Sequence, residues 1–297
     1  MATNELVGAL AQLWRFPVKS MLGERLEVAQ ISDRGLLGDR AYGLIDATTG
    51  KVVSAKSVKA FPGLFACRAS FVEPPRPGEP LPPVRITLPD GTVVTSDSPN
   101  VNAMLSEFFH RDVMLARAAP DDFTIDQHHP DLAEHDPARQ NDTVSESKLG
   151  AALFAQIGMQ SPVPAGSFLD VFPVSVLTSS TLDRLNTLRS ESRFDVRRFR
   201  MNLIVGTHAA GFVENDWVGR SLSIGNDVAL HVTMPDPRCV MTTLAQEDLP
   251  QDIDVLRTLT RHNNIQVATL GTFPCAGVYA VVESAGTVRQ GDRIVLR

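Results

Sequence analysis

The segment that decides the fold reads VALHVTMPDPRCVMTT (residues 228–243). Its first six residues are a strand-like run, and two prolines follow. Because Pro235 and Pro237 cannot donate to a sheet ladder and fix their own φ, the strand is expected to stop there and the chain to turn. The sequence therefore predicts a β-strand followed by a loop that presents Cys239.

The thiol of Cys239 has two possible roles, one chemical and one structural. The guanidinium of Arg238 favours the thiolate, which attacks electrophiles and binds soft metals. Free cysteine is also among the most buried residue types and usually serves as a small apolar side chain. The local sequence leaves both interpretations open.

The composition describes an ordinary globular protein. With 297 residues, 43% apolar and 21% charged, the chain is long enough for two domains. The net charge of −6 argues against nucleic acid as the main partner. No apolar run has the length of a membrane span, and the N-terminal residues lack signal-peptide features. Three cysteines without a CxxC pair favour a reducing compartment, and hence a cytoplasmic location.

The chain has no sequence signature of a built-in electron carrier. It lacks a cysteine-rich iron–sulfur run, a CxxCH haem attachment and a GxGxxG dinucleotide turn. A redox enzyme with this sequence would therefore receive its electrons from a separate protein.

The pattern of apolar residues predicts mostly strands. In the first part we expect short strands around a turn over 44–53, a hairpin over 84–94 with Asp90-Gly91 at its turn, and a helix over 100–110. The polar, proline-containing stretch 121–164 predicts a long loop with one helix over 145–158.

The second part of the chain is also predicted to be rich in strands. We expect a hairpin over 221–233, helices over 181–189 and 253–262, and strands over 174–178, 201–205, 278–282 and 293–296. The fold class is thus mainly β with a few helices (α+β), as a barrel or sandwich. The expected division is an N-terminal β-barrel-like domain (1–120), a connecting segment (121–165) and a second β domain (166–297).

Several motifs occur in an order that points to one family. They are LWRFPVKS (13–20), GDRAY (38–42), RFRMNLIV (198–205), PRCVMTT (237–243) and GTVRQGDRI (286–294). Together they resemble a MOSC domain preceded by its N-terminal β-barrel domain, as in molybdenum cofactor sulfurases and amidoxime-reducing proteins. The resemblance is weak over 73–83 and 116–167.

The resemblance implies a molybdenum cofactor (a molybdopterin) with Cys239 as metal ligand and catalytic residue. A thiolate is the soft ligand that the metal needs, and guanidinium, ammonium and amide groups suit the phosphate and the pterin edge. The residues matched to cofactor binding are Lys19, Ser20, Arg40, Thr178, Ser179, Arg200, Asn202 and Arg238. The sequence departs from the family at Pro237, where amidoxime reducers carry a serine.

Simpler structural roles stand beside these. Lys19 and Ser20 alone read as a solvated lysine and a strand-ending serine, and Arg40 could pair with Asp39 or Asp33. Asn202 could satisfy nearby backbone. Asp236 is either a catalytic proton donor for N–O cleavage or a turn-forming aspartate.

The implied activity is a two-electron reduction of an N-hydroxylated substrate, such as an amidoxime or hydroxylamine. The electron donor would be a separate ferredoxin-type or cytochrome b5-type protein. One alternative is a carrier of persulfide sulfur on Cys239 or of the molybdenum cofactor. Another is a cysteine-dependent hydrolase or thiol transferase with His231 as base. The resemblance also carries a secondary expectation of pyridoxal phosphate binding.

Three further features are interpreted as structural. His128, His129 and His135 lie among acidic residues but fit no standard zinc spacing, so a solvated loop is expected. Cys275 could be a sulfur-carrying partner but is expected to be buried, and Cys67 reads as a core residue.

Overall fold

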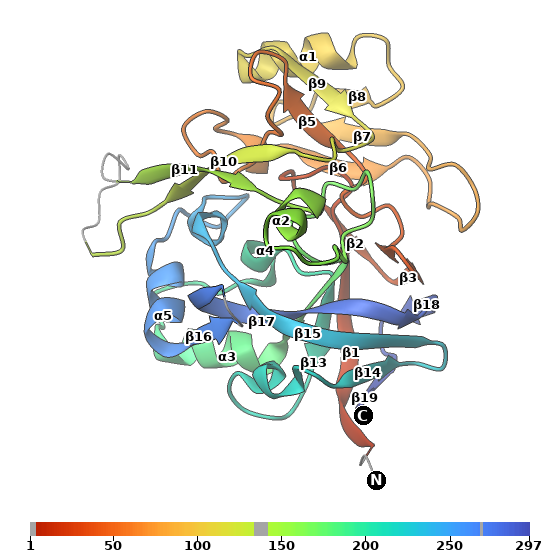
Figure 1. The fold of residues 1–297 in the computed structure, drawn as a ribbon, viewed down its shortest axis with the longest axis vertical. Coiled ribbons are helices and arrows are strands. Elements are labelled where there is room, and N and C mark those ends of the chain that lie inside the picture. The colour runs from red at the N-terminus through yellow and green to blue at the C-terminus, as the bar shows by residue number, and fades with distance from the viewer. Residues whose placement is uncertain (1–3, 134–141, 268–269) are drawn as a thin grey trace.

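The computed structural model describes residues 4–133, 142–267 and 270–297 (Figure 1). Strands dominate and the helices are short, which confirms the predicted mainly β class. Figure 1 shows one β structure in the lower half and smaller sheets above it, with both chain ends at the lower end. Within these residues, no helix combines the length and the apolarity needed to cross a membrane.

The lower half is a closed barrel of seven strands. The barrel closes because β17 pairs with both β15 and β12, and only β12 and β13 run parallel. In order around the barrel, the strands are β12 (Val174–Thr178), β13 (Leu203–Gly206), β1 (Glu5–Arg15), β19 (Arg293–Leu296), β14 (Ser221–Ile224), β15 (Val228–Pro237) and β17 (Gly271–Ser284).

Alternating side chains fill the barrel. On β15, Val228, Leu230 and Val232 are buried in its core, whereas the residues between them are partly exposed. On β12, Val176 faces this core and Leu177 faces the opposite side, where helices pack. Period-two alternation thus buries one face of each strand inside the barrel.

Three helices cover the outside of the barrel around a second core. These are α3 (Ser179–Leu188), α4 (Val196–Phe199) and α5 (Asp254–His262). Leu185 of α3, Phe199 of α4 and Leu259 of α5 are buried against each other and against Ile204 of β13. This core fixes the helices to the outer face of the sheet.

The upper half is built from small sheets around a separate core. Its elements are β5 (Gly43–Asp46) paired with β9 (Val113–Ala116), the sheet β6 (Arg68–Phe71), β7 (Val84–Thr87) and β8 (Val93–Thr95), and α1 (Val101–Phe109). Leu105 of α1 and Ile86 of β7 are fully buried in this core. Met241 and Leu244, which follow Cys239, pack against the same core and so join the two halves.

The first strands of the chain pair with its last ones. β1 pairs with β19, and β2 (Glu24–Leu26) extends the sheet beside β1. A small sheet combines β3 (Val28–Ser32), β4 (Gly35–Leu36) and β18 (Gly286–Arg289). The division at residues 120 and 165 stays a proposal, and any N-terminal unit would share its first strand with the barrel.

The structure corrects the prediction of a long loop over 121–164. This stretch forms a hairpin of β10 (Thr124–His129) and β11 (Thr143–Lys148), followed by α2 (Ala151–Gln156). The helix predicted from residue 145 begins only at Ala151, because residues 145–148 pair with β10. The prediction missed the hairpin because its strands carry mostly polar residues without clear apolar alternation.

The structure also corrects the predicted end of the strand at Pro235. β15 continues to Pro237, whose Cα pairs with that of Cys275 on β17. The ladder shifts register twice in this region, and its pairing with β14 ends at His231. Prolines are tolerated here because the strand end is an irregular edge that needs few donors. The remaining short strand, β16 (Asn264–Val267), pairs with β17.

Candidate functional site

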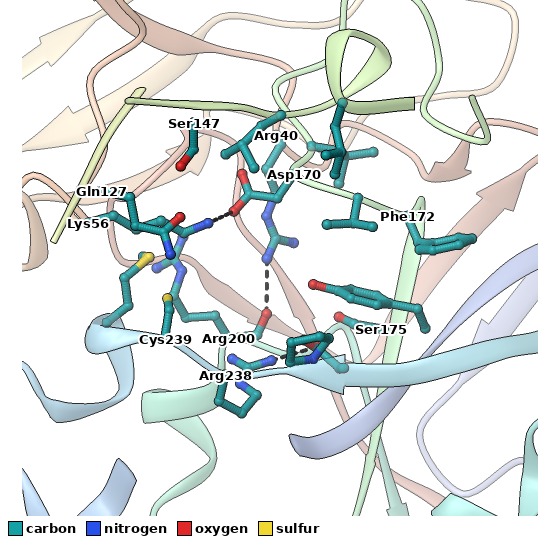
Figure 2. Close-up of a pocket in the computed structure, with 18 of the residues that line it drawn as sticks. Arg40, Lys56, Gln127, Ser147, Asp170, Phe172, Ser175, Arg200, Arg238 and Cys239 are labelled. Carbon is teal, nitrogen blue, oxygen red and sulfur yellow. Dashed lines mark hydrogen bonds and ion pairs between the residues drawn. The ribbon is translucent and has the colours of Figure 1, made fainter. Parts of the chain in front are cut away.

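A cavity of about 460 Å³ lies where the barrel meets the upper sheets, the hairpin and α2 (Figure 2). Eight of the predicted site residues line it although they come from four separate parts of the chain. They are Lys19, Ser20, Arg40, Arg200, Asn202, Asp236, Arg238 and Cys239.

Cys239 lies just beyond the end of β15, at the start of a 3₁₀ turn (Val240–Thr243). Its side chain is partly exposed and contributes to the cavity wall. The backbone oxygen of Cys239 accepts bonds from both the amide and the hydroxyl of Thr242, at 3.1 and 3.0 Å. The backbone around this thiol is therefore fixed.

Arg198 holds the Cys239 turn from behind. Its guanidinium is fully buried and donates to the carbonyl oxygens of Thr242 (3.3 Å), Leu244 (3.2 Å), Pro250 (2.8 Å) and Arg193 (2.9 Å). A planar fork with five donors is suited to collecting several carbonyls. Arg198 does not line the cavity, and it acts by positioning the turn that does.

Asp236 is a buried acid next to Arg238. One carboxylate oxygen accepts from Arg238 at 2.5 Å, and the carboxyl group also lies against the Tyr279 hydroxyl. Among the described residues, the buried Nε atom of Arg238 has no hydrogen-bond partner. Burial raises the pKa of Asp236 to about 6, although Arg238 opposes the shift. Burial also raises the pKa of Tyr279, with Asp236 adding to the shift. Asp236 can therefore hold a proton near neutral pH.

Two arginines of the cavity wall stack on one aromatic ring. The guanidinium carbons of Arg40 and Arg200 lie 4.5 and 4.4 Å from the ring centroid of Phe16. Arg40 also pairs with Asp39 and donates to the carbonyl oxygen of Arg200 at 2.9 Å. Burial lowers the pKa of Arg200 to about 9, so its side chain stays charged at neutral pH.

Three cavity residues have a left-handed backbone. Ser20, Arg40 and Arg200 have φ values of 65°, 46° and 56°, whereas His110 and Glu247, which share this conformation, do not line the cavity. Such conformations are unfavourable for residues other than glycine and persist where surrounding contacts hold them. Their clustering favours this cavity as the candidate functional site.

A carboxylate joins two lysines at the cavity wall. Asp170 pairs with Lys19 and, at 2.7 Å, with Lys56; Lys19 also donates to the carbonyl of Phe168 at 2.9 Å. Burial would raise the pKa of Asp170, but the two ammoniums hold it far below its usual range. Burial disfavours the charge of both lysines, and it lowers the pKa of Lys19. The pKa of Lys56 is nevertheless raised, because Asp170 and Cys239 outweigh burial there.

The polar atoms of Asn202 are already engaged inside the protein. Its side-chain oxygen accepts from the amide and hydroxyl of Ser175 (3.1 and 3.0 Å), and its nitrogen donates to Asp39 at 2.9 Å. Asp39 in turn binds Arg40 and accepts from the amide of Phe16 at 2.8 Å. Asn202 thus orients the carboxylate of Asp39, which pairs with Arg40. The simpler structural role, hydrogen bonding to neighbouring protein groups, accounts for all of these bonds.

Thr178 and Ser179 do not line the cavity. They form the start of α3, where the Thr178 hydroxyl donates to the buried carboxylate of Glu214 (2.6 Å) and accepts from the amide of Thr181. Ser179 donates to the carbonyl of Thr207 at 3.3 Å. Thr178 is the last residue of β12 and the N-cap of α3, so both hydroxyls are bound within the turn from the strand into the helix and not at the cavity.

Neither a second cysteine nor a histidine base accompanies Cys239 among the described residues that line the cavity. Cys67 and Cys275 are fully buried, as predicted, and burial raises the pKa of each thiol to about 12. His231 lies on β15 next to Glu283, and of the described residues that line the cavity none is a histidine.

The predicted loop around the histidine cluster is instead partly a strand. His128 and His129 belong to β10, whereas Glu134, His135 and Asp136 lie outside the described residues. The part of the chain that the structure describes contains no metal-ligand cluster of three or more His, Cys, Asp or Glu residues.

Several cavity residues were not predicted from the sequence. Lys56, Asp170 and Tyr279 line the cavity, and Gln127 and Ser147 reach it from the hairpin. Asp170 and Lys56 are 114 positions apart. Only a signal for contacts between distant positions could have paired them.

The cavity carries a surplus of positive charge on a chain whose net charge is −6. Six cationic side chains line it, against the carboxylates Asp170 and Asp236: Lys19, Arg40, Lys56, Lys148, Arg200 and Arg238. Converging cations in a walled cavity suit an anionic ligand such as a phosphate. A thiol at the same site adds a ligand for a soft metal.

Comparison with family models divides the chain in two. Residues 7–75 match the MOSC N-terminal beta barrel domain, and residues 165–295 match the MOSC domain. All cavity residues named above lie in these two ranges, except those of the hairpin and α2.

Curated relatives match at low identity. The chain is 30% identical over 132 residues to mitochondrial amidoxime reducing component 2 of Bos taurus, covering 43% of this chain and 38% of that protein. It is 24% identical over 315 residues to mitochondrial amidoxime-reducing component 1 of Mus musculus, covering 98% of this chain and 82% of that protein. Among solved structures, the YuaD protein of Bacillus subtilis aligns with a TM-score of 0.43 and 10% identity, over 100% of this chain and 98% of that one.

Proposed function

Because this chain is a MOSC domain protein with a MOSC N-terminal β-barrel domain, homologous to the mitochondrial amidoxime reducing components, we propose that it is a molybdenum-cofactor-dependent reductase of N-hydroxylated compounds. The observation that carries this proposal is the meeting of a partly exposed thiol, Cys239, with six cationic side chains in one cavity.

The residues present fit a molybdopterin. Cys239 would hold the metal, and Lys19, Lys56, Arg40 and Arg200 would hold the phosphate and pterin oxygens. The buried, unbonded Nε atom of Arg238 is a donor that still needs an acceptor. Pro237 supplies no donor at the position of the family's serine, so Arg238 and Lys56 must provide the nearby polar contacts.

The proposed reaction converts an N–OH group and two electrons with two protons into N–H and water. When bound, the cofactor supplies the two-electron redox chemistry. The carboxyl of Asp236 would hold a proton and deliver it to the departing hydroxyl as the N–O bond breaks. The electrons would come from a separate ferredoxin-type or cytochrome b5-type protein, since the sequence carries three isolated cysteines and no motif for a redox cofactor of its own.

The test is molybdenum content per chain in protein made by a host that synthesises the cofactor. We expect about one metal per wild-type chain, loss of most of it in Cys239→Ala, and reduction of benzamidoxime by the wild type with a chemical electron donor. Cys67→Ala is the matched control, because it removes a thiol that is buried outside the cavity. A folded wild-type protein without molybdenum would refute the proposal.

A carrier of persulfide sulfur is a second candidate. It is favoured by the partial exposure of Cys239 and by the nearby ammonium of Lys56, whose pKa the thiol helps to raise. Cyanide-releasable sulfur that is lost in Cys239→Ala, in protein free of molybdenum, would support this function instead.

A further inference from the structure

The cavity has two parts with different relations to the family. The floor comprises the lining residues within 7–75 and 165–295, the ranges that match the MOSC models. The roof comprises the lining residues between these ranges, which come from β10, from β11, from α2 and from the short link between β11 and α2: Gln127, Ser147, Lys148, Leu149 and Leu153. Groups that bind a cofactor common to the family are expected on the floor, because the floor matches the family models. Groups that bind the substrate of this particular chain are expected on the roof.

The roof is held firmly over the floor by backbone bonds. The amide of His128 donates to the carbonyl of Lys56 at 3.0 Å, and the amide of Val52 donates to the carbonyl of Thr124 at the same distance. The hydroxyl of Ser57 donates to the carbonyl of Asp126 at 2.5 Å. These bonds lie on both sides of Gln127 and fix its backbone beside Lys56. The position of the Gln127 backbone beside the cavity is therefore set before any ligand binds.

Gln127 is the roof residue best placed for recognition. Figure 2 shows its side chain extending toward the side of the cavity where Lys56 and Cys239 lie. No hydrogen bond to its amide group is formed within the described part of the chain, whereas its cross-strand neighbour Ser145 bonds to His129 at 2.9 Å. The Gln127 amide is thus a donor and an acceptor available to a ligand near the thiol.

Two of the other roof residues offer an apolar surface. Leu149 and Leu153 line the cavity together with Leu169, Val171 and Phe172 from the floor. Phe172 is fixed by stacking on Tyr279, with ring centroids 5.4 Å apart. Five of the six cationic groups lie on the floor, where an anionic cofactor would neutralise them, and the sixth, Lys148 of the roof, is paired with Asp122 at 2.9 Å. The roof is therefore suited to a neutral ligand with an apolar body.

We propose that the roof is the substrate-recognition element of this protein: Gln127 binds the N-hydroxylated head of a neutral amidoxime, and Leu149 and Leu153 contact the apolar group attached to it. This inference rests on the proposed function. The Gln127 side-chain oxygen would accept from the amino group of the amidoxime, and its nitrogen would donate to the N–OH group. Gln127 is then a specificity-determining residue, because a substrate lacking either group would leave part of its amide unpaired.

The test is substrate binding to the molybdenum-loaded, oxidised protein without an electron donor, measured by calorimetry with benzamidoxime. Gln127→Met keeps the side-chain size and removes both hydrogen-bonding groups, so we expect its Kd to rise about tenfold. Ser145→Ala, on the same hairpin but outside the cavity, should bind as the wild type does. Leu153→Ala should weaken benzamidoxime about tenfold and acetamidoxime, which has only a methyl group, much less.

Molybdenum content is measured on every variant and separates the outcomes. If Gln127→Met keeps its metal and binds benzamidoxime like the wild type, the recognition role is wrong while the proposed function stands. Loss of molybdenum from Gln127→Met would instead make Gln127 a cofactor contact and also overturn the inference. If the wild type neither holds molybdenum nor reduces benzamidoxime, the proposed function and this inference fall together.

Discussion

The floor and the roof of the cavity are held in place by different means. The floor is fixed by buried charged groups: Arg198 binds four carbonyl oxygens, Asp170 joins two lysines, and Arg200 adopts a left-handed backbone. The roof is fixed by backbone bonds and by exposed ion pairs of Lys51 with Asp126 and Glu146. Changes to the floor should therefore affect stability and cofactor together, whereas changes to the roof should affect the substrate alone.

The largest effect on the floor is expected for Arg198→Met. It leaves four buried carbonyl oxygens without their charged donor, so the free energy of unfolding should fall by about 3 kcal/mol in urea denaturation. Arg193→Met is the matched control, because its guanidinium makes only exposed ion pairs and its loss should cost about 0.5 kcal/mol or less. Equal losses in the two variants would show that Arg198 does not support the turn.

Asp236→Asn is expected to lower the rate of benzamidoxime reduction about a hundredfold with molybdenum retained, since a general acid contributes at least this much. Because the pKa of Asp236 is raised to about 6, the wild-type rate should fall as pH rises above 6. The raised pKa also means that the Asp236 contribution to stability is complete below about pH 4 and is lost as pH rises through about 6. A pH profile shared by the wild type and Asp236→Asn would rule out this proton source.

Asp170→Asn removes the charge that joins Lys19 and Lys56. Both ammoniums are largely buried, so we expect the cofactor-free protein to lose about 2 kcal/mol of unfolding free energy. Inorganic phosphate should stabilise this variant more than the wild type, because an anion can replace the carboxylate. Asp122→Asn, whose pair with Lys148 is exposed, serves as the control in thermal unfolding with and without phosphate.

Lys51→Met should give the smallest effect. Its ion pairs are exposed, so the loss of unfolding free energy should be about 0.5 kcal/mol, with the floor and the molybdenum content unchanged. A benzamidoxime Kd within about twofold of the wild-type value would show that the backbone bonds alone hold the roof. A tenfold weaker Kd would show instead that the ion pairs set the position of Gln127.

Sequence patterns predicted the strands of the barrel better than the hairpin that forms the roof of the cavity. β12 and β19 were predicted with their observed bounds, because short runs of β-branched and apolar residues are buried on both faces or in strict alternation. The hairpin β10–β11 was missed because its stability comes from bonds to residues 52–57, which a local pattern cannot express. Motifs likewise located Cys239 and the arginines, whereas Asp170 and Gln127 enter the cavity only through tertiary contacts.

The pairing of β1 with β19 has a consequence for how the protein is made. Residues 5–9 bond to residues 293–296, so the barrel can close only after almost the whole sequence printed here has been synthesised. Contacts of such high sequence separation form slowly, and β1 must remain unpaired on that edge in the meantime. The cavity next to this barrel is thus completed late in folding, after residues 293–296 have joined β1.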